Sequence, residues 1–316
     1  MRSTTPLLVM ATVGLGAVVS SSSDVTPLAA RLEARIKGER ATVALYAKNL
    51  RTARDVGVGP DRPVRTASTI KLPILCALES LVAAGTVKWD ERVRLRTADK
   101  ISGSGILADL EEGTELSIRN LATLMIIVSD NTATNLVLDR ITADAVNDYL
   151  DTIGLTETRA LRKVRGDVEP PPGTSGMSRA GRLEMNQPFG LGKSTAREMV
   201  RLLEALEAGR IVSPAASADI LAIMKRQQVK DGIGRHTADG VQVASKSGAL
   251  DALRSDVGLV WTSGGPVALA ITVDDLEHVD YSPDNAGNRL ISDLTALILT
   301  DLGGDAPASA GRTGLR

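Results

Sequence analysis

The sequence predicts an α/β fold in which both ends of the chain contribute to one sheet and a helical region is inserted between them. Strand patterns occur near the beginning of the chain and again near its end, whereas the middle has helical apolar spacing. The chain has 316 residues, of which 43% are hydrophobic, so it is long enough to bury a large core. These observations indicate a globular protein of one unit or of two closely joined units.

The first segment is predicted to be a helix followed by a hairpin. Residues 27–36 have the apolar spacing of a helix. Residues 41–46 and 56–58 alternate as short strands do, and the polar residues 49–52 between them favour a turn.

The middle of the chain is predicted to be helical. A helix over residues 68–84 ends at Gly85, and three more follow over 118–128, 133–141 and 144–153. Their connections are short, which is typical of helices that pack as neighbours.

Residues 162–193 interrupt the helical pattern. Three consecutive prolines stand at 170–172, and the segment has little apolar periodicity. Loops of this length are uncommon inside a compact domain and are often functional. A helix then begins with Ser194 as its expected cap and continues to Ala208.

The end of the chain returns to strands. Residues 241–245, 256–262 and 266–273 read as three strands, and 288–302 as a closing helix. The expected organisation is a discontinuous α/β domain and a helical domain, over residues 24–66 with 226–302 and over 67–225, respectively.

Composition excludes several classes of function. The 37 basic and 38 acidic residues nearly cancel and are interspersed, so no basic stripe for nucleic acid is expected. Aromatic residues are only 2% of the chain, which leaves few platforms for stacking bases. The single cysteine, Cys76, excludes an internal disulfide, and the two histidines, His236 and His278, leave little for a metal centre. We therefore expect no metal and no cofactor.

Both ends of the chain carry segments that are predicted to lie outside the folded unit. Residues 1–23 contain Arg2, then an apolar run over 7–19 and then the serines at 20–23, which is the order of a secretory signal peptide. The alternative is a disordered cytosolic leader, because the segment has one positive charge and no Ala-x-Ala site. Residues 303–316 read as a disordered tail. The expected location is exported, periplasmic or secreted, without stable membrane insertion after the leader is removed.

The first reactive motif is Ser68-Thr69-Ile70-Lys71 at the predicted start of a helix. Residues three apart share a helical face, so the Lys71 amine is expected to reach the Ser68 hydroxyl. Free N–H groups at a helix N-terminus favour the oxyanion that forms when a serine attacks a carbonyl. A lysine acts as a base only when it is neutral, which requires burial or nearby positive charge.

Two further motifs carry groups that suit the same chemistry. Ser129-Asp130-Asn131 lies between two apolar helices, where a hydroxyl and an amide can face a cleft. Lys246-Ser247-Gly248-Ala249 ends a predicted strand, where glycine permits close approach and the Ala249 N–H can be an oxyanion donor. Each motif alone is weak evidence, since a Ser cap or a polar turn is common.

In this order and at these separations, the three motifs resemble the set found in class A β-lactamases and penicillin-binding proteins. The resemblance extends to residues 66–72, 131–138 and 194–206 and covers essentially residues 28–302. It implies a β-lactamase / D-alanyl-D-alanine peptidase-like fold, namely a three-layer α/β sandwich with an antiparallel sheet and an inserted all-helical domain.

The resemblance also implies roles for individual residues. Ser68 would form an acyl-enzyme with Lys71 as proton acceptor, and Ser129 would pass a proton to the leaving nitrogen. Asn131 would bind the substrate amide. The substrate carboxylate would bind to Lys246, Ser247 and Arg254, and the Ser68 and Ala249 N–H groups would form the oxyanion hole.

One family element is altered in this sequence. Class A enzymes carry a Glu-x-x-x-Asn loop whose glutamate activates the water that releases the acyl group, and here Arg182 stands four residues before Asn186. Glu169, which precedes a proline, and Glu184, two residues before Asn186, are the candidate bases. Each is equally compatible with a solvated loop charge.

The sequence thus predicts a β-lactamase that acts through a serine acyl-enzyme on a small-molecule β-lactam. The altered loop keeps two alternatives open: a D-alanyl-D-alanine peptidase or esterase that acts on peptidoglycan peptides, and a non-hydrolysing penicillin-binding receptor. We expect a monomer, because no oligomer interface is evident.

Overall fold

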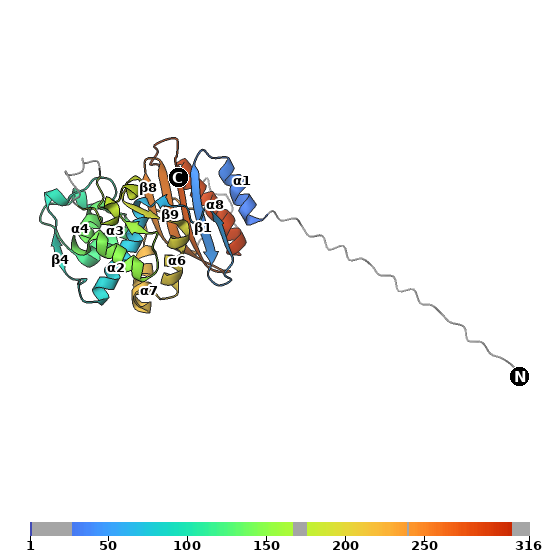
Figure 1. Ribbon diagram of the computed structural model, residues 1–316, viewed down its shortest axis with the longest axis horizontal. Coiled ribbons are helices and arrows are strands. Elements are labelled where there is room, and N and C mark those ends of the chain that lie inside the picture. The colour runs from blue at the N-terminus through green and yellow to red at the C-terminus, as the bar shows by residue number, and fades with distance from the viewer. Residues whose placement is uncertain (2–26, 167–175, 239, 305–316) are drawn as a thin grey trace.

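The computed structural model describes residue 1 and residues 27–166, 176–238 and 240–304 (Figure 1). The predicted signal peptide, apart from Met1, therefore lies outside the described residues. The same is true of Glu169 and of the tail from residue 305 onward.

A five-stranded sheet forms the centre of the molecule. Its strand order is β2-β1-β10-β9-β8, and all of its pairings are antiparallel. The first two strands come from the beginning of the chain and the other three from the end, as the sequence predicts. The bounds are β1 (Thr42–Asn49), β2 (Asp55–Val58), β8 (Gln242–Leu250), β9 (Leu253–Thr262) and β10 (Gly265–Asp274).

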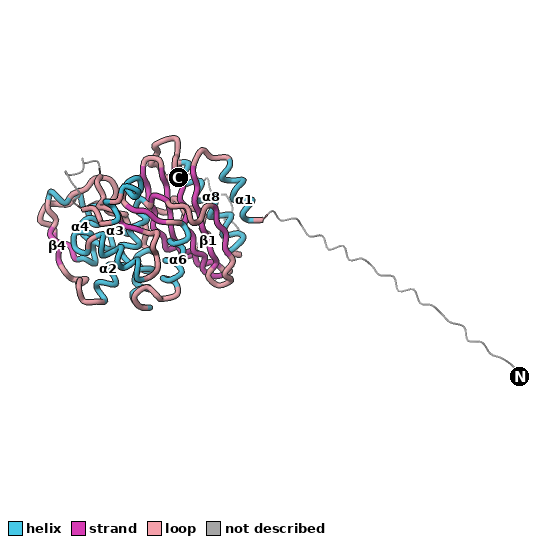
Figure 2. The backbone as a smooth tube through the Cα atoms, viewed as in Figure 1, coloured by secondary structure: helices cyan, strands magenta, loops and turns pink. Residues whose placement is uncertain are grey.

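Helices cover both faces of this sheet. On one face α1 (Leu28–Lys37) packs against α8 (Ala286–Leu302), and both enclose a core with Leu269, Ile271 and Ile291. On the other face α6 (Ala196–Glu207) contacts β1, β9 and β10. Figure 2 shows the strands gathered beside α1 and α8 and the other helices grouped on the far side. The predicted α/β fold with an antiparallel sheet is confirmed.

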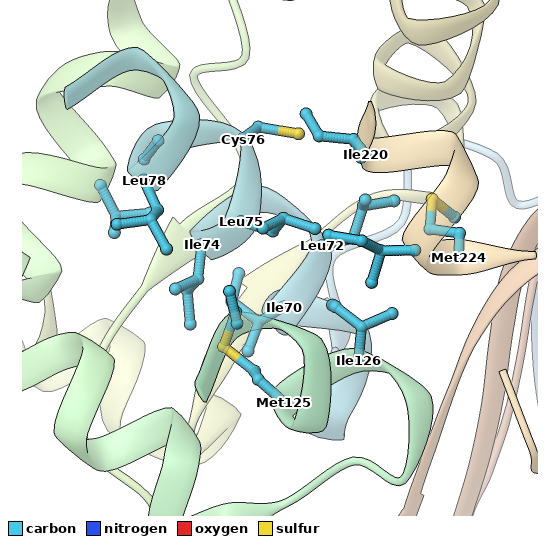
Figure 3. Packing of buried hydrophobic residues seen from close by; sticks show 14 of the residues in the cluster. Ile70, Leu72, Ile74, Leu75, Cys76, Leu78, Met125, Ile126, Ile220 and Met224 are labelled. Atoms are coloured by element: carbon cyan, nitrogen blue, oxygen red, sulfur yellow. The ribbon is translucent and has the colours of Figure 1, made fainter. Parts of the chain in front are cut away.

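The helical part surrounds α2 (Lys71–Ala83). Every residue from Lys71 to Glu79 is buried, so this helix is enclosed on all sides. Figure 3 shows Ile70, Leu72 and Leu75 packed against Met125, Ile126 and Met224. The other helices of this part are α3 (Ile118–Ile127), α4 (Asn131–Ile141), α5 (Ala143–Thr152) and α7 (Pro214–Met224).

Short strands join the loops to this framework. The three-stranded sheet contains β3 (Val64–Arg65), β7 (Gly192–Ser194) and β6 (Arg159–Ala160), and the two-stranded sheet contains β4 (Arg92–Arg94) and β5 (Glu115–Ser117). Among the described residues, no helix combines the length and the apolar character that a membrane crossing requires.

The structure differs from the sequence prediction at one helix cap and in one additional helix. Thr195, not Ser194, caps α6: its side chain accepts a hydrogen bond from Glu198 N, whereas the Ser194 hydroxyl is 2.7 Å from that of Thr158. Helix α7 was not predicted, although Ser213 caps it and Pro214 occupies its first turn.

A pair of carboxyl groups lies between α2, α3 and α7. The Glu79 side chain is buried, and Arg119 Nη1 approaches its Oε1 to 4.0 Å while also pairing with Asp219. Burial, together with the nearby Asp219 carboxylate, raises the pKa of Glu79 to about 8. The Arg119 guanidinium lowers the pKa of Asp219. At neutral pH the pair therefore holds one proton, on Glu79.

We expect this proton to make the stability of the protein pH-dependent. Unfolded Glu titrates near pH ~4.3, so between that pH and about 8 only the folded state retains the proton. The free energy of unfolding should therefore fall as pH rises through this window. Glu79→Gln should reduce the fall between about pH 5 and about pH 9 by roughly 2–4 kcal/mol, as measured by urea denaturation.

Glu115→Gln is the matched control, because Glu115 is an exposed carboxylate on β5. Parallel pH profiles for wild type and Glu79→Gln would contradict the shared proton.

Candidate active site

Ser68 lies in a short 3₁₀ helix, η1 (Ala67–Ile70), directly before α2. The sequence predicts an α-helix from residue 68, whereas the α-helix of the structure begins at Lys71 and Ser68 lies in the 3₁₀ turn before it. Ala67 has a φ of 45°, in the left-handed region that non-glycine residues seldom adopt. Such strain is common at functional sites. Ser68 is half-buried and lines a cavity of about 140 Å³.

The end of β8 lies against the backbone of Ser68. A Cβ atom at Gly248 would be 2.9 Å from Ser68 N and 2.9 Å from Thr66 O. Only glycine therefore allows the strand to approach this closely. Ser247 and Ala249 line the same cavity as Ser68, so the first and third motifs share one site.

Lys71 is fully buried and directs its amine toward the segment between α3 and α4. Its Nζ lies 2.6 Å from Ser129 O, 3.1 Å from Ser129 Oγ and 2.9 Å from Asn131 Oδ1. Burial, and secondly the charge of Lys246, lower the pKa of Lys71 well below its ordinary value, against a smaller effect of Asp130. Among the hydrogen bonds of the described residues, the amine contacts Ser129 and Asn131 and not the expected Ser68 hydroxyl.

Lys246 reaches the same hydroxyl from the sheet. Its Nζ lies 3.1 Å from Ser129 Oγ and 2.5 Å from Ser247 O. Burial lowers the pKa of Lys246 to about 7, and the Asp256 carboxylate opposes this shift. Ser129 Oγ is therefore bonded by two buried amines, one from α2 and one from β8. This arrangement lets a proton pass between either amine and the hydroxyl.

Backbone geometry and Asp130 hold Ser129 in place. Ser129 has a φ of 56°, a second non-glycine residue in the left-handed region. Asp130 is buried and accepts from the backbone N–H groups of Ile106, Leu107 and Ala133, at 2.7, 2.9 and 2.8 Å. Asp130 thus caps α4 and fixes the neighbouring loop, a structural role within the second motif.

Asn131 is fixed at both ends of its amide. Its Oδ1 accepts from Lys71, and its Nδ2 donates to Ser102 O at 2.9 Å. Two N–H bonds are possible for an amide nitrogen, so one remains for a ligand.

Arg254 is buried and lines the cavity. Its guanidinium donates to the backbone oxygens of Leu250, Leu253 and Asp280, and its Cζ lies 4.7 Å from the centre of the Tyr281 ring. Burial lowers the pKa of Arg254, but a guanidinium keeps its charge in proteins. The residue therefore presents a rigidly held cation at this edge of the sheet.

Of the two candidate bases, Glu184 lies among the described residues and Glu169 lies outside them. Glu184 is exposed at the start of the 3₁₀ helix η5 (Glu184–Phe189) and is not among the residues that line the cavity with Ser68. Glu169 follows Gly166 by three residues in the sequence. A Cβ at Gly166 would lie 2.8 Å from Ser102 Oγ, and Asn135 exchanges two 2.9 Å hydrogen bonds with Val164. The loop is therefore attached beside Asn131 just before Glu169.

Sequence reasoning missed several residues that line the cavity, among them Ser104, Asp231 and Asp256. A signal existed for Asp256, since it follows Arg254 by two residues in a strand and so shares its face. Asp231 and Ser104 lie in loops, and the hydrophobic pattern of the sequence does not predict where a loop lies in the fold.

Comparison with known proteins agrees with the geometry of a serine hydrolase. Residues 27–302 match the sequence model of the beta-lactamase enzyme family. A β-lactamase of Bacillus licheniformis is 26% identical over 267 residues, which are 83% of this chain and 80% of the relative. The protein is a serine hydrolase, and it belongs to the beta-lactamase enzyme family.

Solved structures extend the similarity to three dimensions. The β-lactamase of Sphaerobacter thermophilus is 30% identical with a TM-score of 0.76, and the match covers 89% of this chain and 98% of that one. The protein PBP-A is 25% identical with a TM-score of 0.72, over 88% and 96% of the two chains. A mutant of PBP-A has been captured as an acyl-enzyme with penicillin G.

Asp130→Asn should destabilise the fold. One carboxylate oxygen becomes an NH₂ group, which cannot accept from the backbone N–H groups that Asp130 binds. A buried donor left without its partner costs about 1–3 kcal/mol, so the urea midpoint should fall. Asp90→Asn, the same change at an exposed position, is the control. Equal midpoints for the two variants would disprove this role for Asp130.

Proposed function

We propose that this protein is a β-lactamase that opens the β-lactam amide through an acyl-enzyme on Ser68. The observation that carries the proposal is the Ser129 hydroxyl, which two buried lysine amines share beside Ser68. Membership of the beta-lactamase enzyme family supports the same activity.

Acylation begins with neutral Lys71 as the base. Its lowered pKa favours the unprotonated amine relative to that of an ordinary lysine. The Ser68 proton passes to Lys71 while Oγ bonds to the β-lactam carbonyl carbon, and the Ser68 and Ala249 N–H groups stabilise the oxyanion. Ser129 then protonates the departing ring nitrogen and regains a proton from Lys71, to which it is hydrogen-bonded at 3.1 Å.

The remaining residues hold the substrate. Lys246, Ser247 and Arg254 bind the substrate carboxylate, two of them through positive charge. Asn131 donates its remaining N–H to the carbonyl of the acyl side chain. Its orientation is already set by Lys71 and Ser102, so little reorganisation accompanies binding.

Deacylation requires a base for water, and we assign it to Glu169 in preference to Glu184. The attachment of the loop through Asn135 and Gly166 supports this choice, as does the exposure of Glu184. If neither residue activates water, the acyl-enzyme persists. The alternative function is then that of a penicillin-binding peptidase, esterase or receptor, which the similarity to PBP-A favours.

We further propose that the protein is exported with residues 1–23 as a signal peptide and acts as a periplasmic or secreted monomer. The order of charged, apolar and small residues in that segment supports export. A peptidoglycan peptide is the substrate under the alternative function.

The first test is hydrolysis of the chromogenic cephalosporin nitrocefin by the purified protein. We expect sustained turnover that Ser68→Ala abolishes, because no other group replaces the nucleophile. Intact mass after exposure to penicillin should show at most a transient adduct. Glu169→Gln should slow release of the acyl group by about 100-fold or more and make the adduct persist, whereas Glu184→Gln should not.

A single burst followed by a persistent adduct in the wild type would exclude hydrolysis and support the penicillin-binding alternative. Absence of both turnover and adduct would overturn the proposed role of Ser68.

The carboxylate site should lose its charge as pH rises. Lys246 has a pKa of about 7 in the free enzyme, so it is cationic below that pH and neutral above it. For a penicillin, kcat/KM should fall above about pH 7 by up to about tenfold per pH unit. The methyl ester of the same penicillin has no free carboxylate, so its kcat/KM should not show this fall at high pH. Superimposable pH profiles for acid and ester would rule out this role for Lys246.

A further inference from the structure

The cavity that contains Ser68 is also lined by two acidic side chains. Asp231 and Asp256 are the carboxylates among the described residues that line it. Neither has a role in the acylation chemistry proposed above. Asp256 stands on β9, which packs against α8, and Asn288 and Ile291 of α8 line the same cavity.

Strand register explains how Asp256 reaches the substrate carboxylate site. Ser247 pairs with Asp256 across β8 and β9, and Ala249 pairs with Arg254. Side chains that alternate along a strand and face each other across a pair share one face of the sheet. Ser247, Arg254 and Asp256 therefore occupy the same face, and Asp256 lies next to the residues that we assign to carboxylate binding.

The Asp256 carboxylate is buried, and its capacity to accept hydrogen bonds is only partly used. Its side chain is 1% exposed, and Oδ2 accepts from Ile233 N at 2.9 Å. Oδ1 is buried and has no hydrogen-bond partner within the described part of the chain. A buried carboxylate oxygen without a partner is costly, which indicates that a ligand group completes it.

Asp231 is brought to the cavity by a closely packed turn. A Cβ at the adjacent Gly232 would lie 2.6 Å from Asp256 Oδ2 and 3.2 Å from Ile291 Cγ2. Glycine at 232 therefore lets the segment pack directly on Asp256. Asp231 is half-buried at the same cavity wall.

We propose that Asp231 and Asp256 form a subsite for a cationic nitrogen carried by the substrate next to its carboxylate. Arg254 supplies one positive charge and Lys246, when protonated, a second, and the two aspartates of the cavity that contains Arg254 supply negative charge. This arrangement complements a zwitterion rather than a simple anion.

The substrate class that fits is a cephalosporin with a cationic substituent at C3. In such molecules the C3 substituent is attached to the carbon that neighbours the one bearing the carboxylate. A carboxylate held by Ser247 and Arg254 therefore directs the C3 group along the same face of the sheet toward Asp256. This inference rests on the proposed function, because it assumes that β-lactams occupy the cavity.

The test compares two cephalosporins that share one acyl side chain and differ at C3, one with a pyridiniomethyl group and one with an acetoxymethyl group. The measured quantity is the ratio of their kcat/KM values, or of their acylation rates by intact mass if turnover stops at the adduct. Asp231→Asn should lower the cationic-to-neutral ratio about fivefold, since one ion pair at ~4 Å in water is worth about 1 kcal/mol. Asp256→Asn should lower it further, and added salt should reduce the wild-type ratio.

Asp90→Asn is the matched control, because it makes the same change at an exposed position outside the cavity. Asp256→Asn keeps an oxygen for Ile233 N, and its thermal midpoint shows whether it folds. Asp231→Asn carries the test independently if Asp256→Asn does not fold. A ratio that is the same in wild type, Asp231→Asn and a folded Asp256→Asn would overturn the subsite.

Failure of the subsite can be told apart from failure of the proposed function. Binding of both cephalosporins to Ser68→Ala, measured by calorimetry, reports the charge preference without any chemistry. A preference for the cationic compound that Asp231→Asn reduces there would support the subsite even if the wild type forms no adduct. Equal affinities for the two compounds would overturn it.

Discussion

Two lysine amines buried around one hydroxyl are the constraint on which the rest of the site depends. Lys71 and Lys246 are both fully buried, and each is hydrogen-bonded to Ser129 Oγ at 3.1 Å. Two ammonium groups cannot both keep their charge at low cost in such a place: burial lowers the pKa of both lysines, and the charge of Lys246 lowers that of Lys71 further. The same conditions that make these groups unfavourable for stability favour the neutral amine that the proposed mechanism requires of Lys71.

The fold holds this arrangement through positions that admit few alternatives. Gly248 lets the edge strand approach Ser68 N, and Asp130 ties the start of α4 to the loop at Ile106. Ser129 adopts a backbone conformation that is unusual for its residue type. Lys71 donates to its carbonyl oxygen, and the adjacent Asp130 accepts from backbone N–H groups of the neighbouring loop. The two halves of the site come from the sheet and from the helices, so their packing fixes the distance between the amines.

Much of this could be predicted from the sequence. The sheet built from both chain ends follows from apolar periodicity, and the three motifs identified the residues that now cluster around Ser129. The partners of Lys71 could not be predicted, because spacing along a helix places it near Ser68 but says nothing of the α3–α4 segment that its amine contacts. Likewise Thr195 and Ser194 are both able to cap a helix, and only the contact with Thr158 decides between them.

Acylation and release of the acyl group depend on different kinds of structure here. The groups to which we assign activation of Ser68 and protonation of the leaving nitrogen stand on α2, on β8 and at the α3–α4 junction, all of which are tightly packed. The carboxylate that we propose as the base for water belongs to the 162–193 loop, which Asn135 attaches at Val164 beside Asn131. A rigid scaffold therefore supplies the first half of the reaction and a loop the second. In the proposed mechanism, the loop carboxylate determines whether the acyl-enzyme that this scaffold forms is hydrolysed quickly or persists.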